Sequence, residues 1–511
     1  MVIYCPPDFQ TDPAAVKRIA VVSGGKVFAF EHCHPRHETP AVIDVGAVTP
    51  FPAMAVFGLG IAAIWLMPDM RESWPQLADE LLHLDGYRSH ELSSDGQLAG
   101  VVIQRPTGGL PMGIYAPFVN DAWGIAIQME NPFIGISDVA EGLALAAHTL
   151  SIQLRFSPSY TGLTMLRQEL SDWERRRGPL PELSAEWRER LQELRPTYAV
   201  WRRPFPRHVL RENWSQVRLV QFDRNSSFVS SAREVGVGDP VPTIAFIPGA
   251  PGVYRVRSWT APPRYTALPG PFCVGEGIGD YPASSQTPVW AWEPQIRLAI
   301  AHGYQPDVAE GYFWPKGQRG QVHDLFRSWQ GRLWAARNAA RAYGGPAGRI
   351  AEAVIKKAGV STIGRLVQRE GRAVVATRAA RERGLRILSR ETDASGELTG
   401  KAEVVMDLGR TDLVQPGWWS TIIANANERL WNALYRAAPH DTIMAYVDAL
   451  FCLSALHPEL CGDPHKPGAF RDAGAIRVPL DQLDYLDTLS APDLVKALHH
   501  IGEENWHGEA V

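Results

Sequence analysis

Three short segments carry residue types that could perform phosphoryl transfer. Residues 222–228 read FDRNSSF, residues 356–364 read KKAGVSTIG and residues 445–451 read AYVDALF. A carboxylate in or at the end of a buried strand is costly unless it is paired or binds a metal. Asp223 and Asp448 could meet on one sheet and hold two divalent cations, which prefer oxygen ligands and stabilise attacking and leaving oxygens.

The middle segment adds positive charge. Lys356 and Arg349 are seven residues apart on a predicted helix, so they lie on one face and could neutralise a triphosphate. Each segment alone also fits an ordinary role, because a strand aspartate often caps a turn and a helix lysine is usually solvated. The combination and the order of the three segments favour a catalytic role over these ordinary roles.

Together the segments resemble the motifs of family B DNA polymerases, especially the protein-primed phage and plasmid branch. The first is similar to motif A, Asp-x-Asn-Ser-Leu-Tyr-Pro: Asp223, Asn225 and Ser226 match, and Phe228 replaces the tyrosine. The resemblance implies a metal ligand at Asp223. It also implies a nucleotide-binding segment made of Asn225, Ser226, Ser227 and Phe228.

The second segment is similar to motif B, Lys-x-x-x-Asn-Ser-x-Tyr-Gly. Lys356, Ser361 and Gly364 match in register, whereas Val360 and Ile363 depart from the pattern. The resemblance implies that the matching residues contact the nucleotide, with Arg349 beside them.

The third segment is similar to motif C, Tyr-x-Asp-Thr-Asp-Ser, in either of two registers. One places Asp448 on the second, metal-binding aspartate and leaves Tyr446 where the first would be. The other matches Tyr446 to the tyrosine and Asp448 to the first aspartate, and leaves Leu450 in place of the metal ligand. In both registers Asp448 is the carboxylate of this strand that could bind metal.

The resemblance covers residues from about 196 to 511 and implies an α/β and α+β architecture. An RNase H-like domain would precede a right-hand polymerase of palm, fingers and thumb. The N-terminal domain should be a degenerate exonuclease, because its one Asp-x-Glu, Asp172–Glu174, lies in a charged helix and Asp44 has no glutamate partner. The expected domains are 1–195 (exonuclease-like), 196–320 (palm, first part), 321–370 (fingers), 371–460 (palm, second part) and 461–511 (thumb).

Hydrophobic periodicity predicts the elements that must position these residues. Residues 236–285, dense in proline and glycine, read as loops. The expected strands are 18–22, 42–48, 61–66, 100–103, 123–127, 217–222, 402–408 and 442–453. The expected helices are 74–84, 139–154, 163–194, 322–341, 347–369, 418–437 and 492–500, with a strand-helix pair over 289–302.

The composition limits the class of protein. The chain has 511 residues with 45% hydrophobic and 21% charged residues, which predicts several globular units. A net charge of -4 excludes an unselective nucleic-acid coat but allows a local basic groove. Five cysteines without paired spacing, no signal peptide, and glycine and proline within the apolar run 51–67 predict a cytoplasmic protein without a membrane span.

The sequence therefore predicts a DNA-directed DNA polymerase that uses Mg²⁺ or Mn²⁺, a DNA primer-template and deoxynucleoside triphosphates. A priming or replication protein is a further expected partner, and the primer type is left open. The rival prediction is a catalytically impaired, polymerase-like protein that binds DNA or assists replication, since motif C lacks one aspartate. An α/β hydrolase is disfavoured because the chain has no nucleophile elbow.

Overall fold

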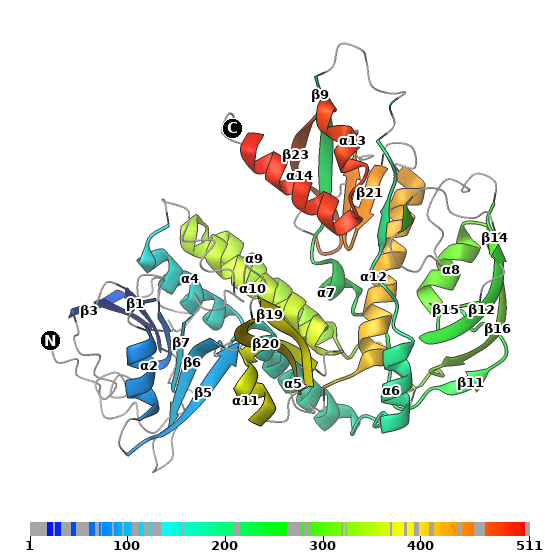
Figure 1. The fold of residues 1–511 in the computed structure, drawn as a ribbon. Coiled ribbons are helices and arrows are strands. Elements are labelled where there is room, and N and C mark those ends of the chain that lie inside the picture. The colour runs from blue at the N-terminus through cyan, green and yellow to red at the C-terminus, as the bar shows by residue number, and fades with distance from the viewer. Residues whose placement is uncertain are drawn as a thin grey trace. The chain divides into compact units, whose positions relative to one another are not determined.

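The computed structural model folds into two compact units that alternate along the chain. Unit 1 comprises Met1–Glu169 and Gly331–Val414, and unit 2 comprises Leu170–Gln330 and Gln415–Val511 (Figure 1). The structure describes residues 18–505 except 24–25, 32–41, 48–60, 67–70, 73, 84–85, 95–96, 105–111, 117–122, 124–133, 153, 155–156, 206, 208–214, 263–276, 279–283, 286–287, 318–319, 323, 368–369, 383–385, 393–397, 408–412, 438–441 and 454–465.

Unit 1 contains a seven-stranded mixed sheet in the order β3-β2-β1-β4-β7-β6-β5. β1, β4 and β7 run parallel, and the remaining pairs are antiparallel. Helix α2 (Trp74–Leu82) packs on β5 and β6 through its buried apolar stripe. The strands are β1 (Arg18–Ser23), β2 (Lys26–Glu31), β3 (Val42–Ala47), β4 (Ile61–Leu66), β5 (Arg88–Ser94), β6 (Gln97–Gln104) and β7 (Met112–Tyr115).

The helices of unit 1 pack closely because small residues lie at their contacts. A Cβ atom on Gly142 of α4 (Ile136–Thr149) would come within 2.7 Å of Ile350 on α10 (Gly345–Arg365). A Cβ atom on Gly162 of α5 (Pro158–Arg177) would come within 1.7 Å of the Thr362 hydroxyl on the same α10. The segment 356–364 therefore lies on a helix that α4 and α5 approach closely. Helix α9 (Arg327–Tyr343) precedes α10 in the chain.

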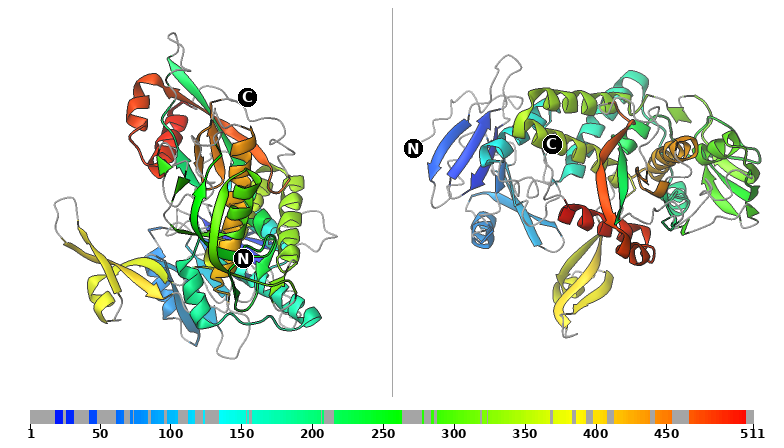
Figure 2. Two further views of the ribbon diagram at one scale, coloured as in Figure 1. Left: turned by 90° about the vertical axis from the view of Figure 1, so that its right-hand side faces the viewer. Right: turned by 90° about the horizontal axis from the view of Figure 1, so that it is seen from above.

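A three-stranded antiparallel sheet follows α10 in unit 1. Its order is β18-β20-β19, and helix α11 contacts all three strands (Figure 2). The elements are β18 (Glu370–Ala376), α11 (Thr377–Glu382), β19 (Arg386–Thr392) and β20 (Leu398–Asp407).

Unit 2 is built on a six-stranded sheet in the order β13-β8-β21-β22-β9-β23. Side chains alternate along β9: Val220 and Phe222 join one core, while Val217 and Leu219 join the other. This alternation is the period-two pattern of a strand covered on both faces. The strands are β8 (Val200–Arg202), β9 (Gln216–Arg224), β13 (Gly277–Ile278), β21 (Thr442–Tyr446), β22 (Ala449–Cys452) and β23 (Phe470–Pro479).

Helices cover the two faces of this sheet. The long helix α12 (Pro416–Ala437) packs its Leu430 and Leu434 side chains against the core that contains Val220 and Phe222. Helix α14 (Ala491–Asn505) packs Leu494 against the opposite core (Figure 1). The smaller helical elements of unit 2 are α6 (Ala185–Glu193), α7 (Ser227–Ser231), η5 (Leu480–Gln482) and α13 (Leu483–Leu486).

A second sheet in unit 2 corrects the expectation that residues 236–285 form loops. β12 (Gly252–Thr260) is a nine-residue strand that pairs with β16 (Gln305–Phe313) and β15 (Val289–Trp292). The high proline and glycine content of this region had concealed its alternating pattern. This sheet also contains β11 (Val241–Thr243) and β14 (Ser284–Ser285), whereas β10 (Val235–Gly236) and β17 (Gln321–Val322) form a separate two-stranded sheet.

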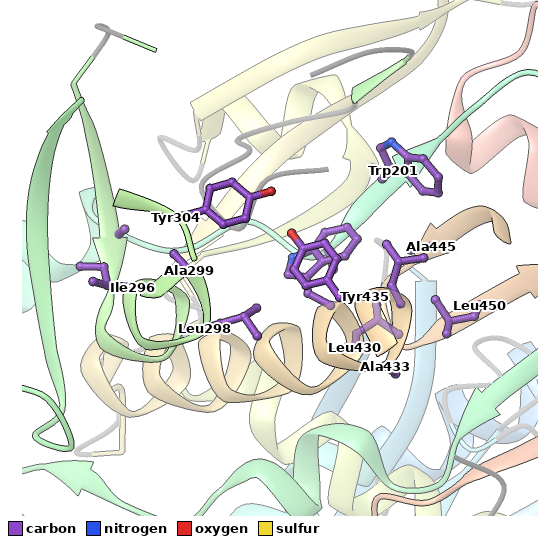
Figure 3. Close-up of a cluster of buried hydrophobic side chains, with 14 of the residues drawn as sticks. Trp201, Ile296, Leu298, Ala299, Tyr304, Leu430, Ala433, Tyr435, Ala445 and Leu450 are labelled. Carbon is purple, nitrogen blue, oxygen red and sulfur yellow. The ribbon is translucent and has the colours of Figure 1, made fainter. Parts of the chain in front are cut away.

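Helix α8 (Glu293–Ala301) joins this second sheet to the main core of unit 2. Its Ile296, Leu298 and Ala299 belong to one hydrophobic cluster with Tyr435 of α12 and Trp201 of β8 (Figure 3). The region between β9 and α9 is therefore fixed to the sheet that carries Asp223 and Asp448.

Most of the predicted elements are confirmed within a few residues, among them β4, α2, α12 and α14. The expected helix 163–194 is two helices, because residues 178–184 are not helical. Residues 124–127 of the strand expected at 123–127 lie outside the described residues, as do residues 51–60 and 67 of the apolar run, and the described Trp123 is in a turn. Within the described part of the chain, no helix combines the length and apolarity that crossing a membrane requires.

Candidate active site

Asp223 lies near the end of β9, where two neighbouring strands fix its position. Ala449 of β22 pairs with it on one side, and Arg471 of β23 pairs with it on the other. Its Oδ1 accepts a hydrogen bond from Gln221 Nε2 at 2.8 Å, and Arg471 Nη2 lies 4.0 Å from its Oδ2. The side chain is 31% exposed, so the carboxylate is available to a ligand at the end of the strand.

Asp448 lies in the turn between β21 and β22, and this corrects the expectation of one strand over 442–453. Tyr446 pairs with Ala449, so Val447 and Asp448 form a two-residue hairpin turn. The backbone N–H of Arg224 donates to the Asp448 carbonyl at 3.1 Å. The structure therefore brings Asp448 and the residue after Asp223 into direct contact at one edge of the sheet.

Both carboxylates are flanked by unusual backbone conformations. Within the described residues, three non-glycine residues have positive φ: Ser151, Ser226 and Val447. Two of them adjoin the candidate site, with φ values of 51° at Ser226 and 58° at Val447. Such conformations cost roughly 1–3 kcal/mol each and cluster at functional sites. Val447 is held by its N–H, which donates to Ala199 O at 2.7 Å.

Arg224 is a buried cation whose charge interacts with the Asp448 carboxylate, and sequence reasoning gave it no role. Its side chain is 3% exposed and donates to Gly468 O at 3.1 Å, Ser227 Oγ at 3.0 Å and Ser230 Oγ at 3.3 Å. Burial and then repulsion from Arg429 lower the pKa of Arg224 to about 9, while the Asp448 carboxylate acts in the opposite direction. The site thus contains a fixed positive charge.

The residues after Asp223 form a tightly bonded turn. Asn225 N donates to Ala469 O at 2.9 Å, and Gly468 N donates to Asn225 O at 2.7 Å. Asn225, Ser226 and Ser227 are all buried, and Ser226 starts the short helix α7. These contacts anchor the turn to the segment before β23, so its polar groups have a structural role whether or not a nucleotide binds.

Phe228 belongs to a group of aromatic side chains that sequence reasoning did not connect. Tyr198 lies edge-on to Phe228, with ring centroids 5.8 Å apart, and edge-on to Trp419 at the same separation. Tyr198 is 40% exposed, whereas Trp419 is buried. Burial raises the pKa of the Tyr198 hydroxyl. The half-buried Phe228 ring thus packs on Tyr198, which in turn packs on Trp419.

The remaining predicted residues lie on α10, in unit 1. Arg349, Lys356 and Gly364 are exposed, Ser361 is half-buried, and the seven-residue spacing of Arg349 and Lys356 places them along one side of the helix. Asp223 and Asp448 belong to unit 2. The structure confirms the helix predicted for Lys356, and a joint site of both units stays a prediction.

Three charged residues connect α9 and α10. Glu352, one helical turn before Lys356, accepts hydrogen bonds from Arg337 Nη2 at 2.7 Å and Arg341 Nε at 2.8 Å. Burial raises the pKa of Glu352, but the hydrogen bonds from Arg341 and Arg337 outweigh burial and hold this pKa below its usual value. Arg337 is 4% exposed, so this ion pair is largely removed from water.

The chemistry of the donors fits a divalent cation of the magnesium type. Mg²⁺ is commonly held by one or two carboxylates together with water and substrate phosphates, rather than by a complete protein cage. Asp223 and Asp448 would supply two carboxylates. Among the described residues no group of three or more His, Cys, Asp or Glu side chains forms a metal cluster.

Comparison with known proteins identifies the fold. The structure is similar to phi29 DNA polymerase complexed with primer-template DNA, with a TM-score of 0.53 and 12% identity over 90% of this chain and 85% of that chain. Its ternary complex with primer-template DNA and incoming nucleotides gives a TM-score of 0.53 and 12% identity over 90% and 86%. No family model and no curated protein matches the sequence. The chain therefore has a mixed α/β fold with a distant structural relationship to this polymerase.

Proposed function

We propose that the protein is a template-dependent DNA polymerase that adds deoxynucleotides by two-metal-ion phosphoryl transfer. One observation carries this proposal. Strands β9 and β22 are neighbours, so Asp223 and the Asp448 turn lie at the same end of two adjacent strands of one sheet. Polymerases need two carboxylates on adjacent strands with open space above them. The resemblance of the flanking segments to the family B motifs and the similarity to phi29 DNA polymerase support the same function.

The proposal assigns a role to each part of the site. Asp223 and Asp448 would hold Mg²⁺ or Mn²⁺, which when bound neutralise the phosphates and stabilise the attacking and leaving oxygens. Lys356 and Arg349 would contact the triphosphate, and Ser361 and Gly364 would lie next to it. The segment Asn225–Phe228 would lie beneath the incoming sugar. Catalysis then consists of positioning and charge stabilisation without a covalent protein intermediate.

The same proposal includes the domain arrangement expected from the sequence. The palm would consist of 196–320 and 371–460, the fingers of 321–370 and the thumb of 461–511. The N-terminal residues 1–195 would be an exonuclease-like domain without activity. A primer-template and a priming protein would be the macromolecular partners.

A primer-extension assay tests the proposal. The protein should extend a primed DNA template with deoxynucleotides in Mg²⁺ or Mn²⁺ and should stop when EDTA is added. Templates primed by DNA, by RNA and by a protein hydroxyl should be compared, since the fold does not fix the primer. A protein that extends none of them, while remaining folded by circular dichroism, would contradict the proposal.

A second candidate function is DNA binding without synthesis. Two observations favour it: Arg471 lies within ion-pair distance of Asp223, and Leu450, the position of the second aspartate in one motif C register, is fully buried in the core. This protein would bind primer-template DNA at the same surface but add no nucleotide. Primer-template binding in EDTA, together with no extension in Mn²⁺, would select this candidate.

A further inference from the structure

A charged pocket in unit 2 lies next to the candidate active site and has no role in the proposed reaction. It has a volume of about 290 Å³, close to the lower limit of small-molecule sites. Helix α12, the start of α8, the segment after α7 and the loop before β12 form its walls. Six of its lining residues are ionisable: Arg233, Glu234, Glu293, Arg297, Glu428 and Arg429.

Arg297 pairs with two of the carboxylates that line the pocket. Arg297 Nε lies 3.1 Å from Glu293 Oε1, and Arg297 Nη2 lies 3.0 Å from Glu428 Oε2. Glu293 also accepts a hydrogen bond from Gly249 N at 2.8 Å. Burial raises the pKa of both Glu293 and Glu428. These carboxylates are fixed by their partners, and they keep oxygen lone pairs that could accept hydrogen bonds from a ligand.

Two further arginines, Arg233 and Arg429, line the same pocket. Arg429 Nη1 donates to the backbone oxygen of Ser230 at 3.2 Å and to its hydroxyl at 3.4 Å, and no described carboxylate forms an ion pair with Arg429. Arg233 is exposed, and it likewise has no ion pair in the described part of the chain. Burial and then repulsion from Arg233 lower the pKa of Arg429 to about 10, while Glu428 acts in the opposite direction. Two adjacent guanidinium groups favour an anion between them.

We propose that this pocket binds a nucleoside phosphate at a site separate from the candidate active site. Arg233 and Arg429 would hold the phosphate, because guanidinium groups match phosphate oxygens in pairs. The oxygens of Glu293 and Glu428 would accept hydrogen bonds from sugar hydroxyls or base amino groups, which bare phosphate lacks. Ser230 Oγ accepts from Arg224 as well as from Arg429, so it connects the pocket to the residue beside Asp223.

Isothermal titration in EDTA tests the site without metal ions or primer-template. We expect dATP to bind the wild type, and Arg233→Ala to weaken binding by about tenfold or more. Arg429→Lys, which keeps the charge but loses the paired geometry, should weaken it as well. Arg257→Ala should leave binding unchanged, because Arg257 is an exposed arginine of β12 that pairs with Asp307 and lies outside the pocket.

The other probes distinguish the sources of phosphate. Inorganic pyrophosphate and a short oligothymidylate should bind at least tenfold more weakly than dATP, since the first lacks a nucleoside and the second exceeds the pocket. Equal binding of pyrophosphate would overturn the nucleoside assignment. No dATP binding, or binding lost in Asp223→Asn but retained in Arg233→Ala, would overturn the site. Neither result depends on primer extension, so the polymerase proposal stands or falls separately.

Discussion

Buried arginines are held in two different ways in the two units. In unit 1, Arg337 and Arg341 both donate to the one carboxylate of Glu352, which links α9 to α10. In unit 2, Arg224 and Arg429 donate to carbonyl and hydroxyl oxygens, and no described carboxylate forms an ion pair with either. In unit 1 the positive charge of the arginines is balanced by the Glu352 carboxylate. In unit 2 the positive charge near Asp448 is not balanced by an ion pair among the described residues.

The difference supports the proposed location of the site. A buried charge without an ion pair is costly, so a fold that retains one has usually a use for the charge. The Arg224 region combines such a charge with two strained backbone positions and two carboxylates. The α9–α10 pair shows none of these features around Glu352, and its arginines are explained by stability.

The largest predicted effect concerns the carboxylates. Asp223→Asn and Asp448→Asn should each reduce primer extension by at least about 10³-fold, because each removes a metal ligand. Thermal unfolding should stay close to that of the wild type, since Asp223 is partly exposed and Asp448 lies in a turn. Asp307→Asn, an exposed carboxylate of β16, is the matched control. A near-normal rate in either variant would remove that residue from the site.

The ion pair of unit 1 should affect stability instead of chemistry. Glu352→Gln should lower the free energy of unfolding by about 2 kcal/mol, because Arg337 stays buried without its carboxylate. Glu310→Gln, which breaks the exposed pair with Arg255, should cost less than about 0.5 kcal/mol. Urea denaturation measures both values. Equal costs would mean that the two ion pairs do not differ as their burial suggests.

The same pair predicts a direction of pH dependence. Because the pKa of Glu352 is held below its usual 4.5 in the folded protein, its stabilising contribution is present above pH 4.5. That contribution is lost as the pH falls through the lower, folded-state pKa. In an acid titration the wild type and Glu352→Gln should therefore converge in stability as the pH falls below the folded-state pKa, and a constant difference would contradict the assignment.

Replacing Lys356 should affect the use of deoxynucleotides more than the binding of primer-template DNA. Lys356→Ala should raise the KM for deoxynucleotides about tenfold, because it removes a charged contact to the triphosphate, and should leave primer-template affinity nearly unchanged. Lys357→Ala is the matched control, since Lys357 is the adjacent exposed lysine of α10. Steady-state kinetics and fluorescence anisotropy give the two quantities. An equal loss of both would move Lys356 to the DNA-binding surface.

The smallest predicted effect concerns the choice of sugar. The Phe228 ring, supported by Tyr198, should exclude a 2'-hydroxyl by its bulk. Phe228→Val should raise the ratio of ribonucleotide to deoxynucleotide incorporation several-fold, by up to about 1.4 kcal/mol of discrimination. Phe246→Val, which removes an aromatic ring packed on Tyr254 elsewhere in unit 2, should leave the ratio unchanged. An unchanged ratio in Phe228→Val would return the ring to a core role.

The sequence was most informative where periodicity and composition agreed. The alternating run around Val220 and the amphipathic stretch ending at Ala437 predicted β9 and α12 nearly to their observed ends. The hairpin at Val447 was missed, because a β-branched residue with positive φ is not a turn signal. β12 was missed because the surrounding glycine and proline residues indicated loops.

The arrangement of charges could not be predicted from the sequence. Arg224 stands at a variable position of the motif A pattern, so the motif assigned it no role. Its burial depends on carbonyl groups from residues more than 200 positions away, such as Ala426 and Gly468. Tyr198, which precedes β8, likewise contacts Phe228 of α7. Local patterns carry no information about such contacts, whereas the Asp223 segment was found because its neighbours in sequence carry the motif.

Asp223 and Asp448 are proposed to form one metal-dependent site, which can be examined by measuring the binding of Mn²⁺. Electron paramagnetic resonance can count the Mn²⁺ ions bound in the presence of primer-template and a non-hydrolysable deoxynucleotide. We expect two bound ions in the wild type, and a loss of binding in both Asp223→Asn and Asp448→Asn. Binding that is unchanged in either variant, or absent in the wild type, would contradict it.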